Sequence, residues 1–489
     1  MEYICGISRD QGTLLPERVD DYIAANNPVR VIDAYVESLN MKELGFAKHE
    51  PNNVGRPMYN PKDLLKLYLY GYMNRIRSSR NLETETKRNL EVIWLLNKLS
   101  PDHKTIARFR QNNPNALKNV FKHFVKTCMG LGLYGKELIA IDGSKFKAWN
   151  TKDRNFTSGK LDDRIKNIDC KIDEYISLLN ETDREESENS DLSNEDITKI
   201  LENLSERREK YIEMQERISN TDEKQVSLTD PDSRLMKTKD GLDVCLNIQS
   251  AVDNKNNMIV EFSVENQVQD KNLMGSIAVK AAETLEVETI TVVADAGYDS
   301  ASDVAGLIAD GFDPHVCGAN YDICIPCKPE DAEEVISYST GRCVYIPERN
   351  IFICPMGQPL YPKTFNKNKR IVKYYNFKAC AACKCKCTAS RYKEAERQVD
   401  YSEYSKDFND ADLYVKQIKV RANRTITRQR KSIIEHTFGT IKRALGISYL
   451  LLCGKEKVTG EISLAFTAFN MKRAINILGV ERMIECLTA

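Results

Sequence analysis

Hydrophobic residues in the first 135 positions recur three and four apart, and this spacing predicts a helical region. The segments that carry it are PVRVIDAYVESLN, PKDLLKLYLYGYMNRI, NLEVIWLLNKL and LKNVFKHFVKTCMGLGL. Residues 161 to 220 follow a heptad instead, with a polar stretch, NETDREESENSDLSNED, in the middle. The seam positions are Leu161, Ile165, Ile168, Ile172, Tyr175, Leu179, Ile197, Leu201, Leu204, Tyr211 and Ile218. This pattern predicts an antiparallel coiled-coil hairpin.

Strand-like segments dominate the middle of the chain. The runs DVCLNIQSAVD and NMIVEFSVENQ precede a helix candidate, NLMGSIAVKAAETL, and ETITVVADAGYDS and DPHVCGANYD follow it. Together with the earlier run ELIAID, the order is strand, long insertion, two strands, helix, strand, helix, strand. This order predicts an α/β fold whose sheet is interrupted by insertions.

Two of the predicted strands end in an aspartate. The apolar run from Leu138 to Ile141 leads to Asp142, and the run from Ile290 to Val293 leads to Asp295. An aspartate at a strand end is usually a turn former or a helix cap. Because α/β sheets place their sites at the carboxyl ends of strands, two such acids favour a functional interpretation.

A third acid lies in a predicted helix, RQRKSIIEHTFGTIKRALG. Its apolar face consists of Ile433, Ile434, Phe438, Ile441 and Leu445, which leads us to expect Glu435 at the core boundary and not on the open surface. Three carboxylates can hold two Mg²⁺ ions, or Mn²⁺, because these cations prefer oxygen ligands. A pair of such ions promotes phosphodiester displacement.

Basic residues around these acids are expected to contact a DNA backbone. Those near the acids are Lys145, Lys147, Arg428, Arg430, Lys431 and Lys442. A further basic helix is expected after Ser100, Pro101 and Asp102, with Ile106 and Phe109 on its inner face. Its basic residues are Lys104, Arg108 and Arg110. This helix is either the recognition helix of a helix-turn-helix unit or a solvated basic surface.

The overall charge hides strong local charge. Lysine plus arginine and aspartate plus glutamate number 71 each, which alone argues against a nucleic-acid partner. Residues 62 to 126 nevertheless contain fourteen basic and five acidic side chains, and residues 416 to 443 contain nine and one. The predicted hairpin, residues 162 to 224, contains ten basic and twenty acidic side chains. Two regions can therefore meet phosphate, while the hairpin suits protein contact or spacing.

The chain lacks an apolar stretch long enough for a membrane span and a signal-peptide pattern at its start, which predicts a cytoplasmic protein. Nine of its fifteen cysteines fall between Cys317 and Cys387. In a reducing compartment such a cluster indicates metal or buried thiols. A structural Zn²⁺ site is expected in this cysteine-rich insertion. Its expected ligands are Cys354, Cys380, Cys383 and Cys387.

The blocks AIDGSKFKAWN, VVADAGYDS and IIEHTFGTIKRALG resemble the three signature blocks of DDE transposases from bacterial insertion sequences. The branch that the whole chain resembles is the one usually numbered eleven eighty-two. The resemblance implies an RNase H-like core in which Asp142, Asp295 and Glu435 are the catalytic triad, and Lys442 the lysine that follows the glutamate. It also implies a bacterial protein, nucleoid-associated when bound to DNA.

By this resemblance the chain would bind the terminal inverted repeats of its element, cut DNA with two Mg²⁺ ions, and join the freed 3′ end to target DNA. Because two ends are processed together, a homodimer or larger assembly on DNA is expected. The expected domains are a DNA-binding domain, 1–135, three core segments, 136–155, 226–320 and 413–489, the hairpin, 156–225, and the cysteine-rich insertion, 321–412. Alternatives are a nuclease without strand transfer and an inactive DNA-binding regulator.

Overall fold

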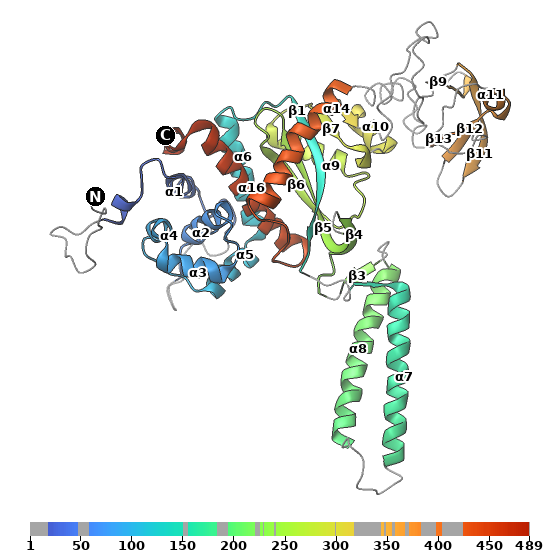
Figure 1. The fold of residues 1–489 in the computed structure, drawn as a ribbon, viewed down its shortest axis with the longest axis horizontal. Coiled ribbons are helices and arrows are strands. Elements are labelled where there is room, and N and C mark those ends of the chain that lie inside the picture. The colour runs from blue at the N-terminus through green and yellow to red at the C-terminus, as the bar shows by residue number, and fades with distance from the viewer. Residues whose placement is uncertain are drawn as a thin grey trace, which may run out of the picture.

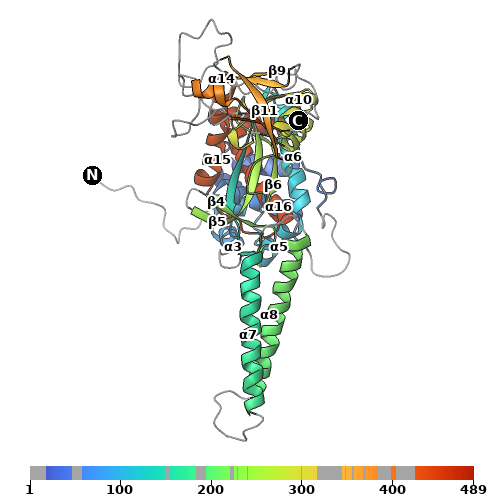
Figure 2. The ribbon, with the colours of Figure 1, turned by 90° about the vertical axis from the view of Figure 1, so that its right-hand side faces the viewer.

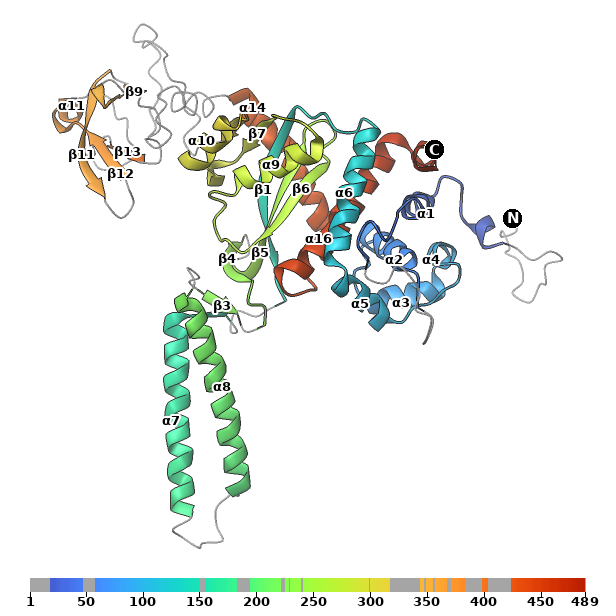
Figure 3. The ribbon, with the colours of Figure 1, turned by 180° about the vertical axis from the view of Figure 1, so that it is seen from behind.

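The computed structural model describes most of the chain in continuous stretches (Figure 1). The described residues are 18–46, 58–149, 155–182, 194–220, 225–227, 229–238, 241–298, 300–316, 344–346, 349–354, 357–366, 371–382, 398–402 and 424–488. A mixed sheet occupies the middle of the molecule, with the amino-terminal helices on one side of it (Figures 1 and 3). The predicted mixed α/β fold with a helical amino-terminal region is confirmed.

The amino-terminal region consists of helices, as the apolar spacing predicts. They are η1 (Val19–Tyr22), α1 (Val29–Glu37), α2 (Pro61–Met73), α3 (Ser79–Arg88), α4 (Leu90–Leu95), α5 (His103–Asn112) and α6 (Pro114–Gly130). Asp102 caps α5 by accepting hydrogen bonds from the backbone of Lys104 and Thr105. Ile106 and Phe109 are buried on its inner face. The predicted helix start is therefore confirmed.

The central sheet has six strands. They are β1 (Leu138–Lys147), β4 (Arg234–Thr238), β5 (Gly241–Asp253), β6 (Ile259–Glu265), β7 (Thr291–Ala294) and β8 (Asp313–Val316). The order is β4-β5-β1-β7-β8, and β6 also pairs with β5. Strand β1 is antiparallel to β5 and parallel to β7, which is in turn parallel to β8. Ile139–Ile141 on β1 and Val292–Ala294 on β7 are apolar and fully buried, because helices cover both faces of the sheet.

Strand β1 has unequal neighbours, and this positions the candidate site. Its pairing with β5 continues to Lys147, whereas its pairing with β7 stops at Ala140. The expectation that the strand ends at Asp142 is therefore wrong, because β1 continues to Lys147. Between Ala140 and the bridge from Lys147 to Tyr449, no described strand pairs with the β7 side of β1, and Asp142 lies in this opening.

Helices pack around the sheet. They are α9 (Met274–Leu285), η3 (Ala296–Tyr298), α10 (Ala301–Ala309), α14 (Arg424–Arg430), η6 (Lys431–Glu435), α15 (His436–Gly439), η7 (Thr440–Ala444), α16 (Lys455–Leu478) and α17 (Val480–Thr488). The segments η6 and η7 are π-helical turns within one continuous helical run. The predicted apolar face of that run, from Ile433 to Leu445, is buried.

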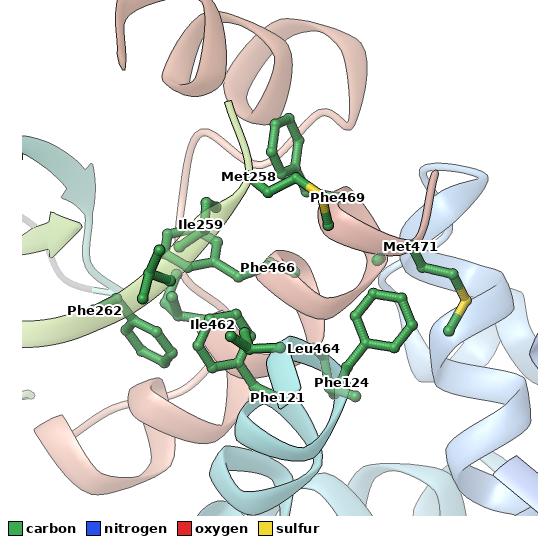
Figure 4. Packing of buried hydrophobic residues seen from close by; sticks show 14 of the residues in the cluster. Phe121, Phe124, Met258, Ile259, Phe262, Ile462, Leu464, Phe466, Phe469 and Met471 are labelled. Carbon is green, nitrogen blue, oxygen red and sulfur yellow. The ribbon is translucent and has the colours of Figure 1, made fainter. Parts of the chain in front are cut away.

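Helix α16 is buried along most of its length, between α6 and β6 (Figure 4). The ring of Phe466 packs edge-on against Phe262, at 5.0 Å between centroids, and against Phe121, at 6.4 Å. Gly460 allows the close approach of α6, since a Cβ there would lie 2.8 Å from the Cα of Pro114. The helix thus joins the amino-terminal helices to the sheet.

Two long helices project away from the body of the molecule (Figures 1 and 2). They are α7 (Ser158–Thr182) and α8 (Asn194–Asn220), and they start from a two-stranded sheet of β2 (Asn155–Thr157) and β3 (Gln225–Ser227). The helices run antiparallel and contact one another, and Arg208 pairs with Asp169 at 2.5 Å between them. That they form a true heptad coiled coil stays a prediction.

A second sheet lies apart from the central one (Figure 3). Its strands form an antiparallel meander in the order β13-β12-β11-β10-β9, with the short helix α11 (Phe377–Ala382). The strands are β9 (Val344–Ile346), β10 (Ile351–Ile353), β11 (Pro359–Asn366), β12 (Ile371–Tyr375) and β13 (Gln398–Ser402). Phe352, Leu360 and Tyr374 form a small core of its own. In the described part of the chain, no helix combines the length and apolarity that a membrane crossing needs.

Replacing Phe466 with alanine should lower the free energy of unfolding by about 3–5 kcal/mol, because the cavity left between α16, α6 and β6 cannot be refilled. Chemical denaturation followed by tryptophan fluorescence measures the change. Ile477→Ala on the same helix is the control, since its side chain is 44% exposed and its loss should cost under about 0.5 kcal/mol. Equal losses in the two variants would contradict the central position of α16.

Candidate active site

Asp142 lies on β1, in the opening beside β7. Its Oδ1 accepts a hydrogen bond from the backbone N–H of Gly143 at 2.8 Å, and its Oδ2 lies 3.2 Å from Nη1 of Arg430. Burial raises the pKa of Asp142 to about 7, Arg430 opposes this shift, and the negative charges of Asp295 and Asp270 add to it. A carboxylate in this position needs a cation nearby to remain ionised.

Arg430, at the end of α14, supplies that cation in this structure. Its Nη2 lies 3.7 Å from Oε1 of Glu435, so that one guanidinium contacts both Asp142 and Glu435. The two carboxylates are therefore close enough for one group to bridge them. The expectation that Glu435 lies at the core boundary is wrong, because its side chain is 57% exposed. Its neighbours Ile433 and Ile434 are buried instead.

Asp295 follows the last residue of β7, as the sequence predicts. Its Oδ1 accepts a hydrogen bond from the backbone N–H of Gly297 at 2.8 Å, which shapes the turn after the strand. The next residue, Tyr298, is fully buried and donates a hydrogen bond to Oε1 of Gln249 on β5. This contact fixes the turn that carries Asp295 to the neighbouring part of the sheet.

A fourth acid, Asp270, which belongs to none of the sequence motifs, lies near Asp142 and Asp295. Its Oδ1 accepts two hydrogen bonds of 2.7 Å, one from the amide of Asn247 and one from the amide of Gln249. Burial raises the pKa of Tyr298 well above its usual value, and the next largest causes are the charges of Asp270, Asp142 and Asp295. The phenol is therefore close to all three acids.

The signal for this network was present in the sequence. Asn247 and Gln249 are polar residues that alternate with Leu246 and Ile248 in the part of β5 from Val244 to Asp253, which is buried throughout. Buried amides require hydrogen-bonding partners, and a partner on another segment is then expected. Periodicity alone did not identify Asp270 as that partner.

Gly143 is necessary for this arrangement. A Cβ at this position would lie 2.7 Å from Oδ1 of Asp270 and 2.9 Å from Oδ1 of Asn247. Both distances are shorter than ordinary van der Waals contact, so any larger residue would displace these side chains. The glycine directly after Asp142 therefore leaves room for the polar network on that face of β1.

The chemistry of these acids fits Mg²⁺ or Mn²⁺, which prefer carboxylate oxygens. Two buried polar atoms near these acids have no hydrogen-bond partner among the described residues: Oδ1 of Asn247 and Oγ of Ser250. Ser250 lies directly across from Asp142 in the β1–β5 register. In the described part of the chain, however, no three histidine, cysteine or acidic side chains are gathered closely enough to hold an ion together. Binding would require these acids to move closer together than they are in this structure.

Two of the predicted DNA contacts have partners within the protein. Arg110 is only 5% exposed; it donates hydrogen bonds to the hydroxyl of Tyr72 and the carbonyl of Arg77, and it lies over the ring of Tyr68. It stabilises the helical domain and is not available to DNA. Arg430 faces the acids, as described above. Lys104, Arg108, Arg428 and Lys431 are exposed.

The other predicted cations lie along β1. Nζ of Lys442 donates a hydrogen bond to the carbonyl of Lys145 and lies 4.5 Å from the ring centre of Phe146. Nζ of Lys145 donates to the carbonyl of Lys237. Lys147 forms an ion pair with Asp243 at 3.1 Å and is half exposed. These lysines line the strand that carries Asp142.

Two of the four predicted zinc ligands can be placed. Cys354 and Cys380 are reduced and partly buried, and Sγ of Cys354 accepts a hydrogen bond from the backbone N–H of Gln358 at 3.4 Å. Cys383 and Cys387 lie outside the described residues.

Comparisons with known proteins match two segments of this chain to protein families. Residues 17–112 match the family described as Transposase domain (DUF772), and residues 353–475 match the family described as Transposase DDE domain. The second segment contains Glu435, whereas Asp142 and Asp295 lie outside both. No curated protein matches the chain.

Among solved structures, the chain is similar to the cryo-EM structure of a piggyBac transposase synaptic complex with hairpin DNA. The identity is 7%, the TM-score is 0.33, and the match covers 95% of this chain and 79% of that chain. A TM-score of this size does not establish a shared fold.

An Arg430→Gln variant should be less stable than the wild type without metal, by about 1–3 kcal/mol, because it leaves Asp142 and Glu435 without their cation. Added Mn²⁺ should then raise its melting temperature more than that of the wild type, since no guanidinium competes for the carboxylates. Differential scanning calorimetry with and without Mn²⁺ measures both effects. Arg428→Gln, an exposed arginine on the same helix, is the control and should change neither.

Proposed function

We infer that this chain, which belongs to the DDE-class transposases, cleaves DNA at the ends of its element and joins them to target DNA at a centre formed by Asp142, Asp295 and Glu435. The observation that carries this proposal is the common position of the first two acids. Asp142 lies on β1 just past its pairing with β7, Asp295 directly follows β7, and their charges influence one another.

The contact between Arg430 and two acids supports the proposal that Glu435 belongs to the catalytic centre. One guanidinium contacts both Asp142 and Glu435, so a cation fits between these carboxylates. Two divalent ions, when bound, activate the attacking oxygen and stabilise the leaving oxygen in phosphodiester displacement. In this proposal Asp142 and Asp295 hold the ions directly, and Glu435 completes the coordination after Arg430 moves away.

The strand arrangement supports the proposed RNase H-like core. Antiparallel β6, β5 and β1 are followed by parallel β7 and β8, and helices lie on both faces of the sheet. In this proposal the core is assembled from residues 136–155, 226–320 and 413–489. The hairpin, 156–225, and the cysteine-rich module, 321–412, are insertions into it.

The helical domain, residues 1–135, is proposed to recognise the inverted repeats. Support comes from the exposed Lys104 and Arg108 on α5, whose opposite face is buried against α3 and α16. Such a helix can enter a groove of DNA while its apolar face remains packed. The same proposal assigns phosphate contacts to the exposed Arg428 and Lys431, and to the lysines along β1.

The two insertions are proposed to have supporting roles. The projecting hairpin is strongly acidic, so we assign it to contact between protein copies when two DNA ends are brought together. The N–H to sulfur hydrogen bond at Cys354 is of the kind that stabilises a metal-bound thiolate, which supports a structural Zn²⁺ site with Cys380, Cys383 and Cys387.

A nuclease that only hydrolyses DNA would use the same acids, so cleavage alone does not decide between the two activities. The deciding experiment is to incubate the full chain with Mg²⁺ and labelled DNA that carries the ends of its element. Joined products, detected by sequencing of the junctions, support transposition. Cleaved ends that never join to target DNA favour the nuclease.

Asp142→Asn, Asp295→Asn and Glu435→Gln should each reduce cleavage of these DNA ends at least about 100-fold, since losing a group that merely supports a metal ligand already costs roughly 10- to 100-fold. Gel-resolved cleavage rates measure the loss, and binding of the same DNA should persist. Asp310→Asn is the control, because this acid is exposed at the end of α10. Unchanged cleavage in the Asp142 variant would point to a different active site.

Arg108→Ala should weaken binding to the DNA ends and reduce the salt dependence of binding by about one unit of slope, as expected for one lost phosphate contact. The buried Arg110 is the matched comparison. Arg110→Ala should instead lower stability by about 1–3 kcal/mol. Fluorescence anisotropy across a salt series measures the loss of DNA affinity, and thermal melts measure the loss of stability. A loss of DNA affinity in the Arg110 variant with unchanged stability contradicts the assignment.

A further inference from the structure

The environment of Asp270 distinguishes it from an ordinary surface acid. Both of its hydrogen bonds from side-chain amides go to the same oxygen, Oδ1. The amides come from Asn247 and Gln249, which are fully buried on β5. The carboxylate is therefore held in one orientation through one oxygen.

The second oxygen of Asp270 lies near Asp295. The point that a Cβ on Gly297 would occupy lies 3.0 Å from Oδ1 of Asp295 and 3.5 Å from Oδ2 of Asp270. Two carboxylate oxygens thus approach one small space beside the turn after β7. Carboxylates repel one another, so this arrangement is stable only if a cation or a proton is shared nearby.

A second, independent feature lies beside Asp270. Oδ1 of Asn247 is buried, and no described residue donates a hydrogen bond to it. A Cβ on Gly143 would lie 2.9 Å from this oxygen and 2.7 Å from Oδ1 of Asp270, so the two oxygens border the same small space. An unpartnered buried acceptor costs about 1–3 kcal/mol. A water molecule bound to a cation would satisfy it, because such a water donates hydrogen bonds.

We propose that Asp270 is a fourth carboxylate of the metal centre, and that Asn247 and Gln249 are positioning residues that aim its free oxygen at the space beside Asp295. The inference rests on the proposed function, since it takes Asp142 and Asp295 as ligands. Tyr298 connects the two acid-bearing segments, because it donates to Gln249 and belongs to the turn that carries Asp295.

The proposal is tested by metal binding to the full chain without DNA. Free Mn²⁺ is titrated by electron paramagnetic resonance against the wild type and the variants Asp142→Asn, Asp295→Asn and Asp270→Asn. We expect Asp270→Asn to weaken Mn²⁺ binding roughly 10- to 100-fold. Asparagine keeps the oxygen that accepts the two amide hydrogen bonds and removes the charge, so the variant should melt like the wild type.

Asp303→Asn is the control acid. Its carboxylate accepts hydrogen bonds from the backbone of Met274 and Gly275 at the start of α9 and has no place in the proposed centre. If Asp142→Asn and Asp295→Asn weaken Mn²⁺ binding while Asp270→Asn binds like Asp303→Asn, the role of Asp270 is overturned and the proposed function stands. If the first two variants bind Mn²⁺ like the wild type, the proposed function itself fails.

Gln249→Met supplies a second variant. It removes one of the two amide donors and leaves the charge of Asp270 in place, so we expect a smaller loss of Mn²⁺ affinity than in Asp270→Asn. If Asp270→Asn does not fold, this variant decides: an affinity equal to that of the wild type overturns the proposal. Cleavage of DNA ends at raised Mn²⁺ should recover in both variants, a recovery that a merely structural defect would not show.

Discussion

The buried carboxylate of Glu461 holds the two halves of this protein together. It accepts hydrogen bonds from the backbone of Leu451 and Leu452 and forms an ion pair with Arg77 at 2.8 Å. A buried charge that loses its partner costs about 3–5 kcal/mol, so the contact strongly favours the packing of these segments against one another. Arg77 belongs to one matched family segment and Glu461 to the other. The helical domain and the carboxyl-terminal helices therefore form one framework.

That framework sets the position of the acids. The helical run with Arg430 and Glu435 ends at η7, just before the backbone that Glu461 fixes. Among the described residues, Arg430 is the cation in ion-pair contact with the acids of the site, and it meets two of them. Three aspartates and a glutamate around one arginine leave an excess of negative charge. This imbalance is the physical basis of the proposal that a divalent cation binds at this place.

The sequence predicted most elements for local reasons. Asp142 and Asp295 follow apolar runs, and each run forms a strand, although β1 continues beyond Asp142 to Lys147. The sequence could not place Arg110 or Asp270, because their roles depend on residues more than twenty positions away. Arg110 was assigned to the surface from its charge, yet the hydroxyl of Tyr72 and the ring of Tyr68 hold it in the core.

The position of Glu435 differs from the one that helical spacing predicts, for another reason. Its expected position assumed a regular α-helix from Arg428 to Leu445, whereas the run contains π-helical turns at Lys431–Glu435 and Thr440–Ala444. Each wider turn rotates the following side chains relative to a regular helix, so residue spacing no longer reports the face. The apolar residues of the run are still buried in the core, whereas Glu435 lies on the outside, where it contacts Arg430. The deviation from regular geometry thus occurs where the charged residues of the candidate site lie.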